Sequence, residues 1–416
     1  MTKRTLPKLQ IQTIYLYLIF GNTLAASFIW GINTIFLLDA GLSNFQAFLA
    51  NAFFTAGMVI FEVPTGIIAD RWGRRESYLL GTITLTLSTI LYLFMWHVHG
   101  PFWGWAASSI LLGLGFTFFS GALEAWLVDA LHATRFRGSL EGVFAKGQIA
   151  GGIAMLAGSL AGGIIAQLTN LGVPYILRAL ILLVNFATAF FLMRDLGFRP
   201  KKSGRPLREM KGIFSASLRH GLGNAPVRWI MLAAPFAVGT SFYVFYALQP
   251  FLLELYGDEK AYGIAGLVAV LIAAAQIAGG FLGPHIRGLF RNRTGILMGG
   301  TVLAALFLVM VSLTRNFWAA LLFIFFWGLI FAAMMPIRQA YINGLIPSKQ
   351  RATVLSFDSL MGSSGGIAIQ PALGKAADVW SYSFSYLIAA FIQLAALPFI
   401  ILARLRKAKS DRIGKK

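Results

Sequence analysis

Two long apolar segments of this chain are joined by Gly66-Ile67-Ile68-Ala69-Asp70-Arg71-Trp72-Gly73-Arg74-Arg75. One carboxylate, two glycines and three arginines lie where a hydrophobic helix would leave a membrane. Glycine permits a tight turn and a close approach of neighbouring helices. Arginines beside a membrane span keep a loop on the cytoplasmic side. The stretch therefore predicts a short cytoplasmic loop between two transmembrane helices.

The composition is that of an integral membrane protein. Of the 416 residues, 57% are hydrophobic and only 12% are charged, and the mean hydropathy is +0.73. A helix needs about 20 apolar residues to cross a bilayer, and in lipid its backbone groups must pair within the segment. The sequence predicts twelve such helices, at about residues 14–38, 45–69, 77–96, 102–128, 142–167, 173–193, 229–254, 262–283, 295–313, 317–345, 353–377 and 382–403.

The distribution of basic residues predicts the orientation. With both termini in the cytoplasm, the outer loops hold only Lys260 and Arg315 among the basic residues. This asymmetry is the positive-inside rule, and it predicts a multi-pass protein of the inner (plasma) membrane that contacts anionic lipids at its cytoplasmic face. It also accounts for the net charge of +20, so that charge does not indicate nucleic-acid binding.

Several classes of chemistry are not expected. The chain has no Cys, which excludes disulfides and thiolate metal sites. Its histidines do not have the spacing of metal ligands, and there is no Walker loop or catalytic triad. The N-terminus is short and basic and runs into a full-length span, so we do not expect a cleaved signal peptide. We therefore expect a monomer without metal or cofactor and without enzyme activity.

The chain contains two related halves. Residues 36–39 at the end of the first span recur as residues 251–254 at the end of the seventh, and residues 151–154 recur as 365–368. The offset is about 215 residues throughout, as expected for a duplicated six-helix unit. The predicted domains are an N-terminal bundle (1–193), a basic cytoplasmic linker (194–226) and a C-terminal bundle with a basic tail (227–416).

The pattern G-x-x-x-D-R-x-G-R-R of residues 66–75 resembles, position for position, the loop between helices 2 and 3 of the major facilitator superfamily. The resemblance covers essentially the whole chain. It implies an all-α membrane protein with two pseudo-symmetric six-helix bundles, in which helices 1, 4, 7 and 10 line a central cavity. It also implies a cytoplasmic gate made by Gly66, Asp70, Arg71, Gly73, Arg74, Arg75 and Asp129. In this gate Asp129 is the charge partner of Arg74, and Asp70 interacts with the start of helix 11.

Carboxylates inside the predicted spans are candidates for proton coupling, because an ionisable group in a membrane is costly and usually functional. The candidates are Glu62, Glu124 and Asp358. In the repeat, Glu62 aligns with Gln276, which places proton chemistry in the N-terminal half. In the family the face of helix 2 that carries Glu62 meets helix 11, so Glu62 and Asp358 are expected close together as a protonation switch. The alternative is a local hydrogen bond of Glu62 beside Pro64.

Other charges in the spans have more than one interpretation. Glu124 and Arg338 occupy nearly equivalent positions of helices 4 and 10, which predicts a salt bridge across the cavity in the outward-open state. Alternatively, either residue binds substrate, or Glu124 pairs with Lys146. Three more residues are expected to be snorkelled or paired locally toward the outer side: Arg178, Lys375 and Asp378.

The expected cavity lining is aromatic and amide-rich, which favours a small amphiphilic organic substrate. Its candidates are Asn22, Trp30, Asn33, Tyr243, Tyr246, Gln249, Arg338 and Gln339, with Trp327, Met334 and Met335 nearby. Residues 158–163 resemble the glycine-rich element of antiporters, with Ser159 in place of its proline. The sequence thus predicts a secondary transporter that exports such a solute in exchange for protons. The alternatives are a proton symporter or facilitator that imports a nutrient or organic anion, and a non-transporting receptor or lipid-handling protein on the same fold.

Overall fold

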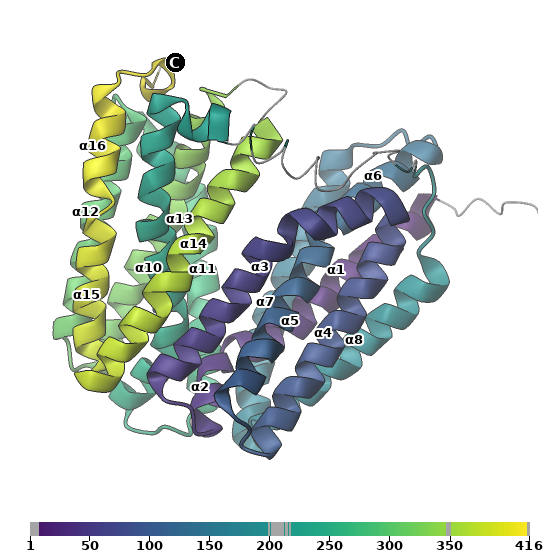
Figure 1. The fold of residues 1–416 in the computed structure, drawn as a ribbon, viewed down its shortest axis with the longest axis horizontal. Helices are drawn as coiled ribbons and strands as arrows, with labels where there is room; N and C mark the ends of the chain where they lie inside the picture. Colours follow the sequence, from purple (N-terminus) through teal and green to yellow (C-terminus); the bar gives the residue numbers. More distant parts are fainter. Residues whose placement is uncertain are drawn as a thin grey trace, which may run out of the picture. The chain divides into compact units, whose positions relative to one another are not determined.

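A computed structural model describes residues 8–198, 200, 212, 215, 218–346 and 351–413. These residues are almost entirely helical and contain no β-strand (Figure 1). The first half holds α1 (Lys8–Trp30), α2 (Asn33–Asp39), α3 (Asn44–Trp72), α4 (Arg74–His97), α5 (Phe102–Phe119), α6 (Ala122–Ala133), α7 (Leu140–Leu168) and α8 (Gly172–Leu192). After a π-helical turn, η1 (Leu218–Leu222), the second half holds α10 (Ala225–Tyr256), α11 (Tyr262–Leu289), α12 (Arg293–Leu313), α13 (Phe317–Asn343), α14 (Arg351–Val379), α15 (Tyr382–Leu394), α16 (Leu397–Leu405) and η3 (Lys409–Asp411).

Each of the twelve expected spans is helical, and three of them consist of two helices. The fourth span breaks between α5 and α6, where Gly121 has a φ of 67°, a conformation that glycine adopts without strain. Eleven of the described helical segments are long and apolar enough to cross a membrane. The span expected at 353–377 is not among them, although α14 has 29 residues. Its glycines, serines and charged side chains lower its hydropathy, and such a helix needs protein neighbours rather than lipid.

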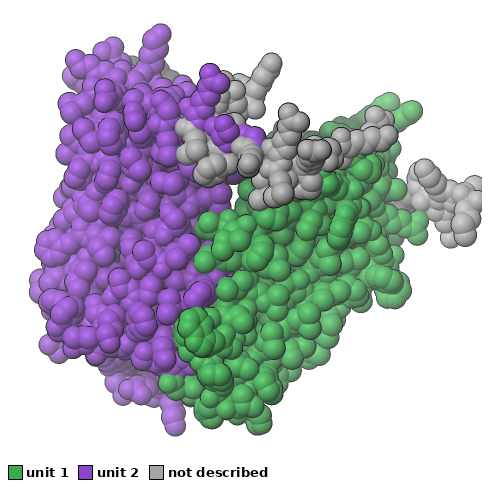
Figure 2. Space-filling model, in the orientation of Figure 1, with its two compact units in different colours: residues 1–41, 56–206, 261–267 green, residues 42–55, 207–260, 268–416 purple. Residues whose placement is uncertain are grey.

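The chain divides into two compact units that are not contiguous in sequence (Figure 2). Unit 1 comprises residues 1–41, 56–206 and 261–267, and unit 2 comprises residues 42–55, 207–260 and 268–416. The start of α3 therefore belongs to unit 2, and the start of α11 belongs to unit 1. Most of the linker, between residues 201 and 217, lies outside the described residues.

Glycines bring the same pair of helices together in each unit. In unit 1, α7 packs on α1, and a Cβ added at Gly162 would overlap the backbone of Phe28. In unit 2, α14 packs on α10, and a Cβ at Gly365 would overlap the backbone of Pro235. The pair of α7 and α1, in the fifth and first spans, thus recurs as the pair of α14 and α10, in the eleventh and seventh spans. Such a recurrence is expected of a duplicated sequence. Small residues let the two backbones approach each other where side chains would hold them apart.

The start of α3, in unit 2, and the start of α11, in unit 1, are each capped by a neighbouring helix of the same unit. In unit 2, the Asp378 carboxylate at the end of α14 accepts the N–H groups of Asn44 (2.9 Å) and Phe45 (2.8 Å) at the start of α3. In unit 1, the Gln167 amide oxygen at the end of α7 accepts the N–H of Gly263 (2.9 Å) at the start of α11. The first amides of a helix lack partners within the helix, so both contacts satisfy donors that would otherwise be free.

Candidate functional site

The loop that joins α3 to α4 turns at Gly73, whose φ of 129° is open only to glycine. α3 ends one residue before Gly73 and α4 begins one residue after it. The last turn of α3 and the first turn of α4 are therefore neighbours. The Arg74 guanidinium lies 2.7 Å from the Asp70 carboxylate. The expected partner of Arg74 was Asp129, and that expectation is wrong: within the described residues Asp129 has no ion pair. Asp70 is nearer because the turn at Gly73 brings the first turn of α4 back to the last turn of α3.

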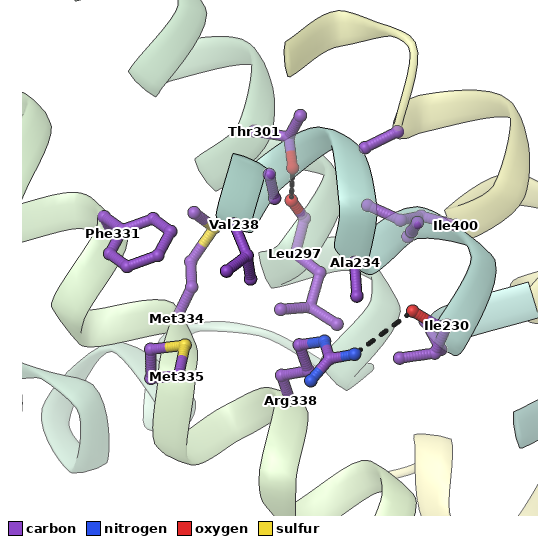
Figure 3. A pocket seen from close by; sticks show the side chains of 13 residues that line it. Ile230, Ala234, Val238, Leu297, Thr301, Phe331, Met334, Met335, Arg338 and Ile400 are labelled. Atoms are coloured by element: carbon purple, nitrogen blue, oxygen red, sulfur yellow. Dashed lines mark hydrogen bonds between the residues drawn. The ribbon is translucent and has the colours of Figure 1, made fainter. Parts of the chain in front are cut away.

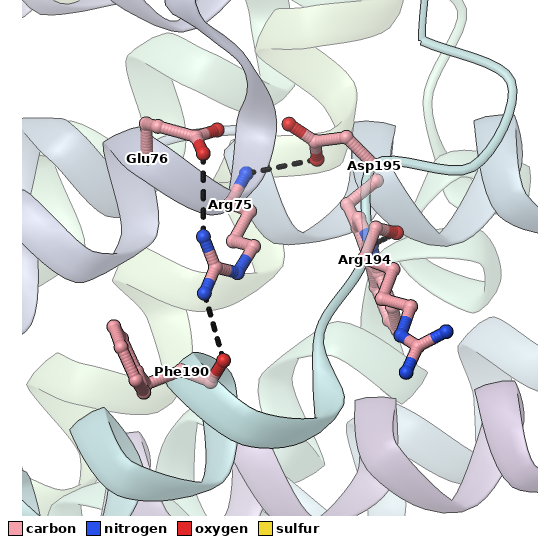
Figure 4. Close-up of polar contacts among 6 residues, drawn as sticks. Arg75, Glu76, Phe190, Arg194 and Asp195 are labelled. Carbon is pink, nitrogen blue, oxygen red and sulfur yellow. Dashed lines mark hydrogen bonds and ion pairs between the residues drawn. The ribbon is translucent and has the colours of Figure 1, made fainter. Parts of the chain in front are cut away.

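Arg75 anchors the same loop to the end of α8 (Figure 4). Its backbone N–H donates to Asp195 Oδ1 (3.0 Å), and its Nη2 donates to the Phe190 carbonyl (2.7 Å). Its Nη1 lies 3.4 Å from Glu76 Oε1. Burial, together with a hydrogen bond to Glu76, raises the pKa of Asp195 to about 6. Asp195 and Glu76 thus share a site beside the arginine, and a Cβ at residue 73 would collide with both carboxylates.

Asp195 was not among the expected site residues. Its signal in the sequence is weak, because it is an isolated acid beside Arg194 at the start of a strongly basic loop. An acid at that place would ordinarily be read as a solvated surface group. Its role follows from the tertiary contact between the end of α8 and the start of α4, which the sequence does not show.

Glu62 lies in α3, two residues before Pro64, and its Oε1 accepts a hydrogen bond from the Ser120 hydroxyl (2.7 Å) at the break between α5 and α6. In the described part of the chain no cation lies within ion-pair distance of it. Its partner is therefore a neutral donor on another helix. The expected approach of Glu62 to Asp358 would join the two units and stays a prediction.

Glu124 lies in the first turn of α6 and is exposed. Lys146 on α7 is exposed as well, and the described residues contain no ion pair between the two. The alternative in which Glu124 pairs with Lys146 is therefore wrong for this structure. The reason is that neither side chain is buried, so neither needs a partner to replace water.

Arg338 on α13 and Asp358 on α14 form a bidentate ion pair. Arg338 Nη1 donates to Asp358 Oδ2 and Nη2 donates to Oδ1, both at 2.5 Å. Nη2 also lies 3.3 Å from the Ile230 carbonyl of α10. The two side chains are 17% and 8% exposed, so the pair is largely desolvated. The planar fork of a guanidinium matches a carboxylate in this geometry better than an ammonium would.

This partner differs from the one that the sequence suggested. Arg338 was expected to pair with Glu124 in the outward-open state, and Asp358 was expected beside Glu62. In the structure Arg338 and Asp358 pair with each other instead. They lie 20 positions apart on helices that follow each other in sequence. The pairing of Arg338 with Glu124 concerns residues of different units and stays a prediction.

A pocket of unit 2 ends at Arg338 (Figure 3). It encloses a cavity of about 50 Å³, counted as the space open to the centres of water molecules. Its lining residues come from α10, α12, α13, α16 and the residue before α16: Ile230, Ala233, Ala234, Ala237, Val238, Leu297, Thr301, Phe331, Met334, Met335, Arg338, Ala396 and Ile400.

Arg338 is the only charged residue among those that line this pocket. The Thr301 hydroxyl donates to the Leu297 carbonyl of its own helix (2.8 Å), so it is already engaged. Met334 and Met335 line this pocket beside Phe331. The sequence placed them at a central cavity between the two halves, which stays a prediction. The arrangement suits a small apolar group with an acidic substituent, because adaptable side chains meet one fixed cation.

Several expected cavity residues are engaged in helix packing. The Asn22 amide oxygen accepts from Tyr78 (3.0 Å) and Asn185 (2.9 Å), and that of Asn33 accepts from Tyr175 (3.1 Å). These contacts join neighbouring helices of unit 1. Their role in binding a solute stays a prediction.

In unit 2, the Tyr243 hydroxyl is hydrogen-bonded to Ser385, and both Tyr243 and Gln249 are buried. Trp30 and Tyr246 are half-buried, and Gln339 is exposed. Whether these five side chains contact a solute likewise stays a prediction.

Arg178 on α8 was expected to be snorkelled or paired locally toward the outer side, and snorkelling is wrong. The side chain is 1% exposed, and its Nε donates to the Thr89 hydroxyl (3.0 Å) and its Nη1 to the Ala25 carbonyl (3.4 Å). The guanidinium carbon lies 5.9 Å from the centre of the Phe116 ring. Its partners are neutral, and the described residues give it no ion pair.

The pair expected between Lys375 and Asp378 is also absent among the described residues. Asp378 binds the first amides of α3 instead, as described above. Two backbone donors at a helix start hold a carboxylate more firmly than one exposed ammonium does. The described residues contain no group of three or more His, Asp or Glu side chains that could hold a metal ion.

Comparison with known proteins agrees with this architecture. The chain matches the Major Facilitator Superfamily over residues 16–369 and 263–416. It belongs to that superfamily. Its members are transporters, and the chain is accordingly a multi-pass membrane transporter built from helices.

Individual relatives are distant. An uncharacterized MFS-type transporter of Methanocaldococcus jannaschii is 22% identical over 257 residues, 62% of this chain and 64% of that protein. Multidrug resistance protein 2 of Bacillus subtilis is 24% identical over 355 residues, 83% of each chain. Among solved structures, that of the nucleoside transporter NupG superposes with a TM-score of 0.76 at 13% identity, covering 95% of this chain and 99% of that one. A likeness at that identity concerns the fold alone.

Proposed function

We propose that this protein exports a small amphiphilic organic solute by alternating access, in exchange for protons. The observation that carries the proposal is Glu62, a carboxylate within a membrane helix whose only partner in the described chain is the Ser120 hydroxyl. An ionisable group within a membrane helix is costly and usually functional, so we assign proton coupling to Glu62. The similarity to a multidrug resistance protein supports export and an organic solute.

The cytoplasmic loop supports a gated cycle. The Asp70–Arg74 ion pair and the contacts of Arg75 and Asp195 hold the ends of α3, α4 and α8 together. These contacts all lie within unit 1, so they fix the loop to its own bundle while that bundle moves. We place this protein in the plasma membrane with both termini in the cytoplasm, because basic residues then gather on one side.

The test is transport by the purified protein in liposomes. A pH-sensitive dye inside the vesicles reports proton movement when a solute gradient is imposed across the membrane. The wild type should move protons opposite to the solute, and Glu62→Gln should bind solute without moving protons. The glutamine retains an oxygen that can accept from Ser120, so the packing is preserved. Glu259→Gln, in the exposed loop before α11, is the matched control.

Proton movement by Glu62→Gln at the wild-type rate would contradict the assignment of that residue. The same measurement on Glu124→Gln then tests the second acid of unit 1. Protons that move in the same direction as the solute would favour a symporter that imports an organic anion. The pocket beside Arg338 gives that second candidate its support, since a guanidinium binds anions.

A further inference from the structure

We infer that the pocket beside Arg338 binds the substrate and that the substrate is a small organic acid with a compact apolar body. This inference rests on the proposed transport function and names the chemistry of the solute. The cavity of about 50 Å³ has room for a few water molecules or for an apolar group such as a phenyl ring or a short branched chain, because one water needs roughly 10–15 Å³ of such space. The acid group of the solute then lies at the charged end.

The charge of the ligand follows from which partner of the ion pair faces the pocket. Arg338 lines the cavity, whereas Asp358 does not. Asp358 occupies one N–H of Nη1 and one of Nη2, and Nη2 also contacts Ile230. A guanidinium has five N–H donors, so the Nε–H and the second N–H of Nη1 remain for another acceptor. These two donors point to opposite edges of the guanidinium, so a carboxylate of the solute can accept from one of them while its apolar body contacts Phe331 and Met334.

A cationic solute is disfavoured by the same geometry. An amine in the cavity would meet the guanidinium first, and like charges at short distance in a dry pocket repel each other. It would reach Asp358 only by displacing the bidentate partner of that residue. A neutral solute would gain the apolar contacts but not a charge-assisted hydrogen bond.

The test compares three probes with the same body: 3-phenylpropanoate, 3-phenylpropanamide and 3-phenylpropylamine. Binding to the purified protein in detergent is measured by titration calorimetry. The wild type should bind the acid about tenfold or more tighter than the amide, since a hydrogen bond between a guanidinium and a carboxylate is stronger than one to a neutral amide oxygen. The amine should bind most weakly.

Variants separate binding from folding. The double variant Arg338→Gln, Asp358→Asn replaces the ion pair by neutral side chains that can hydrogen-bond, and it should bind acid and amide equally. Asp358→Asn alone should bind the acid several-fold more tightly, because the charge of Arg338 is then no longer neutralised. If Asp358 only supported the fold, replacing it would not tighten binding of the acid. Lys375→Gln removes a positive charge from exposed α14 surface and should leave the preference unchanged.

The outcomes decide between the inference and the function on which it rests. Tighter binding of the amine, equal binding of all three probes or no binding of any of them overturns the inference. So does a preference for the acid that survives in the double variant. If the dye assay in liposomes still reports proton exchange for other amphiphilic solutes, the proposed export function stands and only the substrate class is wrong. If neither assay responds, both are wrong.

Discussion

Arg178 of unit 1 and Arg338 of unit 2 both lie inside membrane helices, and the two are accommodated in different ways. In unit 1, Arg178 is fully buried and donates to a hydroxyl and a carbonyl. In unit 2, Arg338 is partly exposed and forms two hydrogen bonds with the Asp358 carboxylate. Among the described residues, Arg178 has only neutral partners and is fully buried. Arg338 lines a pocket and keeps N–H donors that Asp358 does not use, so we assign support of the fold to Arg178 and, with the proposal above, binding to Arg338.

The largest effect is expected for breaking the ion pair of unit 2. Arg338→Gln leaves Asp358 as an unpaired charge that is only 8% exposed, and loss of one partner of a buried pair costs roughly 3–5 kcal/mol. Adding Asp358→Asn should recover most of that free energy of unfolding, because no charge is then buried alone. Chemical unfolding in detergent micelles measures both. A single variant as stable as the double variant would show that the pair is well solvated.

A smaller effect is expected for the arginine of unit 1. Arg178→Met removes a buried charge without leaving another behind, and the Thr89 hydroxyl still donates to the Leu85 carbonyl (2.7 Å). The cost should be about 1–2 kcal/mol, close to that of losing ordinary hydrogen bonds. Arg178→Lys should cost more, because it keeps the buried charge and loses the fork that reaches both Thr89 and Ala25. The comparison fails if Met is the worse replacement in the same unfolding experiment.

The fold could be predicted from sequence because its signals are local. Apolar length, glycine turns and basic loops each act within one span or loop, and they located all twelve helices, including α14 with its low hydropathy. The packing of α7 on α1 recurs as the packing of α14 on α10, which agrees with the duplication although the sequence did not indicate which helices would touch.

The partners of charged groups could not be predicted in the same way. Arg74 pairs with Asp70 rather than Asp129, and Arg338 pairs with Asp358. Successive residues of a helix differ by about 100° in direction, so a small error in the rotation of a helix exchanges one neighbour for another. The sequence identifies which charges need a partner, but the rotation of each helix decides which partner it finds.

The helix caps extend the comparison of the two units to their exposed ends. Asp378→Ala removes a charged acceptor from two amides of α3 and should lower the free energy of unfolding by about 1–2 kcal/mol, the upper range for an N-cap. Gln167→Ala removes a neutral acceptor from one amide of α11 and should cost about 0.5–1 kcal/mol. Equal losses in thermal unfolding would mean that the charge of Asp378 contributes nothing beyond its hydrogen bonds.

The smallest effect is expected at the loop between α3 and α4 of unit 1, where it depends on pH. Burial and the hydrogen bond with Glu76 raise the pKa of Asp195 from 3.8 to about 6. Between these values the folded protein holds a proton that the unfolded chain has released, so Asp195 lowers stability as pH rises from about 4 to about 6 and the loss persists above that.

Asp195→Asn should therefore flatten the pH dependence of the unfolding temperature and raise it near neutral pH, where the amide can donate to Glu76. The bond from the Arg75 N–H is retained by the remaining oxygen. Glu259→Gln, which changes an exposed acid in the loop before α11, controls for the loss of one negative charge. If Asp195→Asn and the wild type lose stability in parallel as pH rises, the proton lies on another group. In that case the burial of Asp195 does not govern the pH response of the loop.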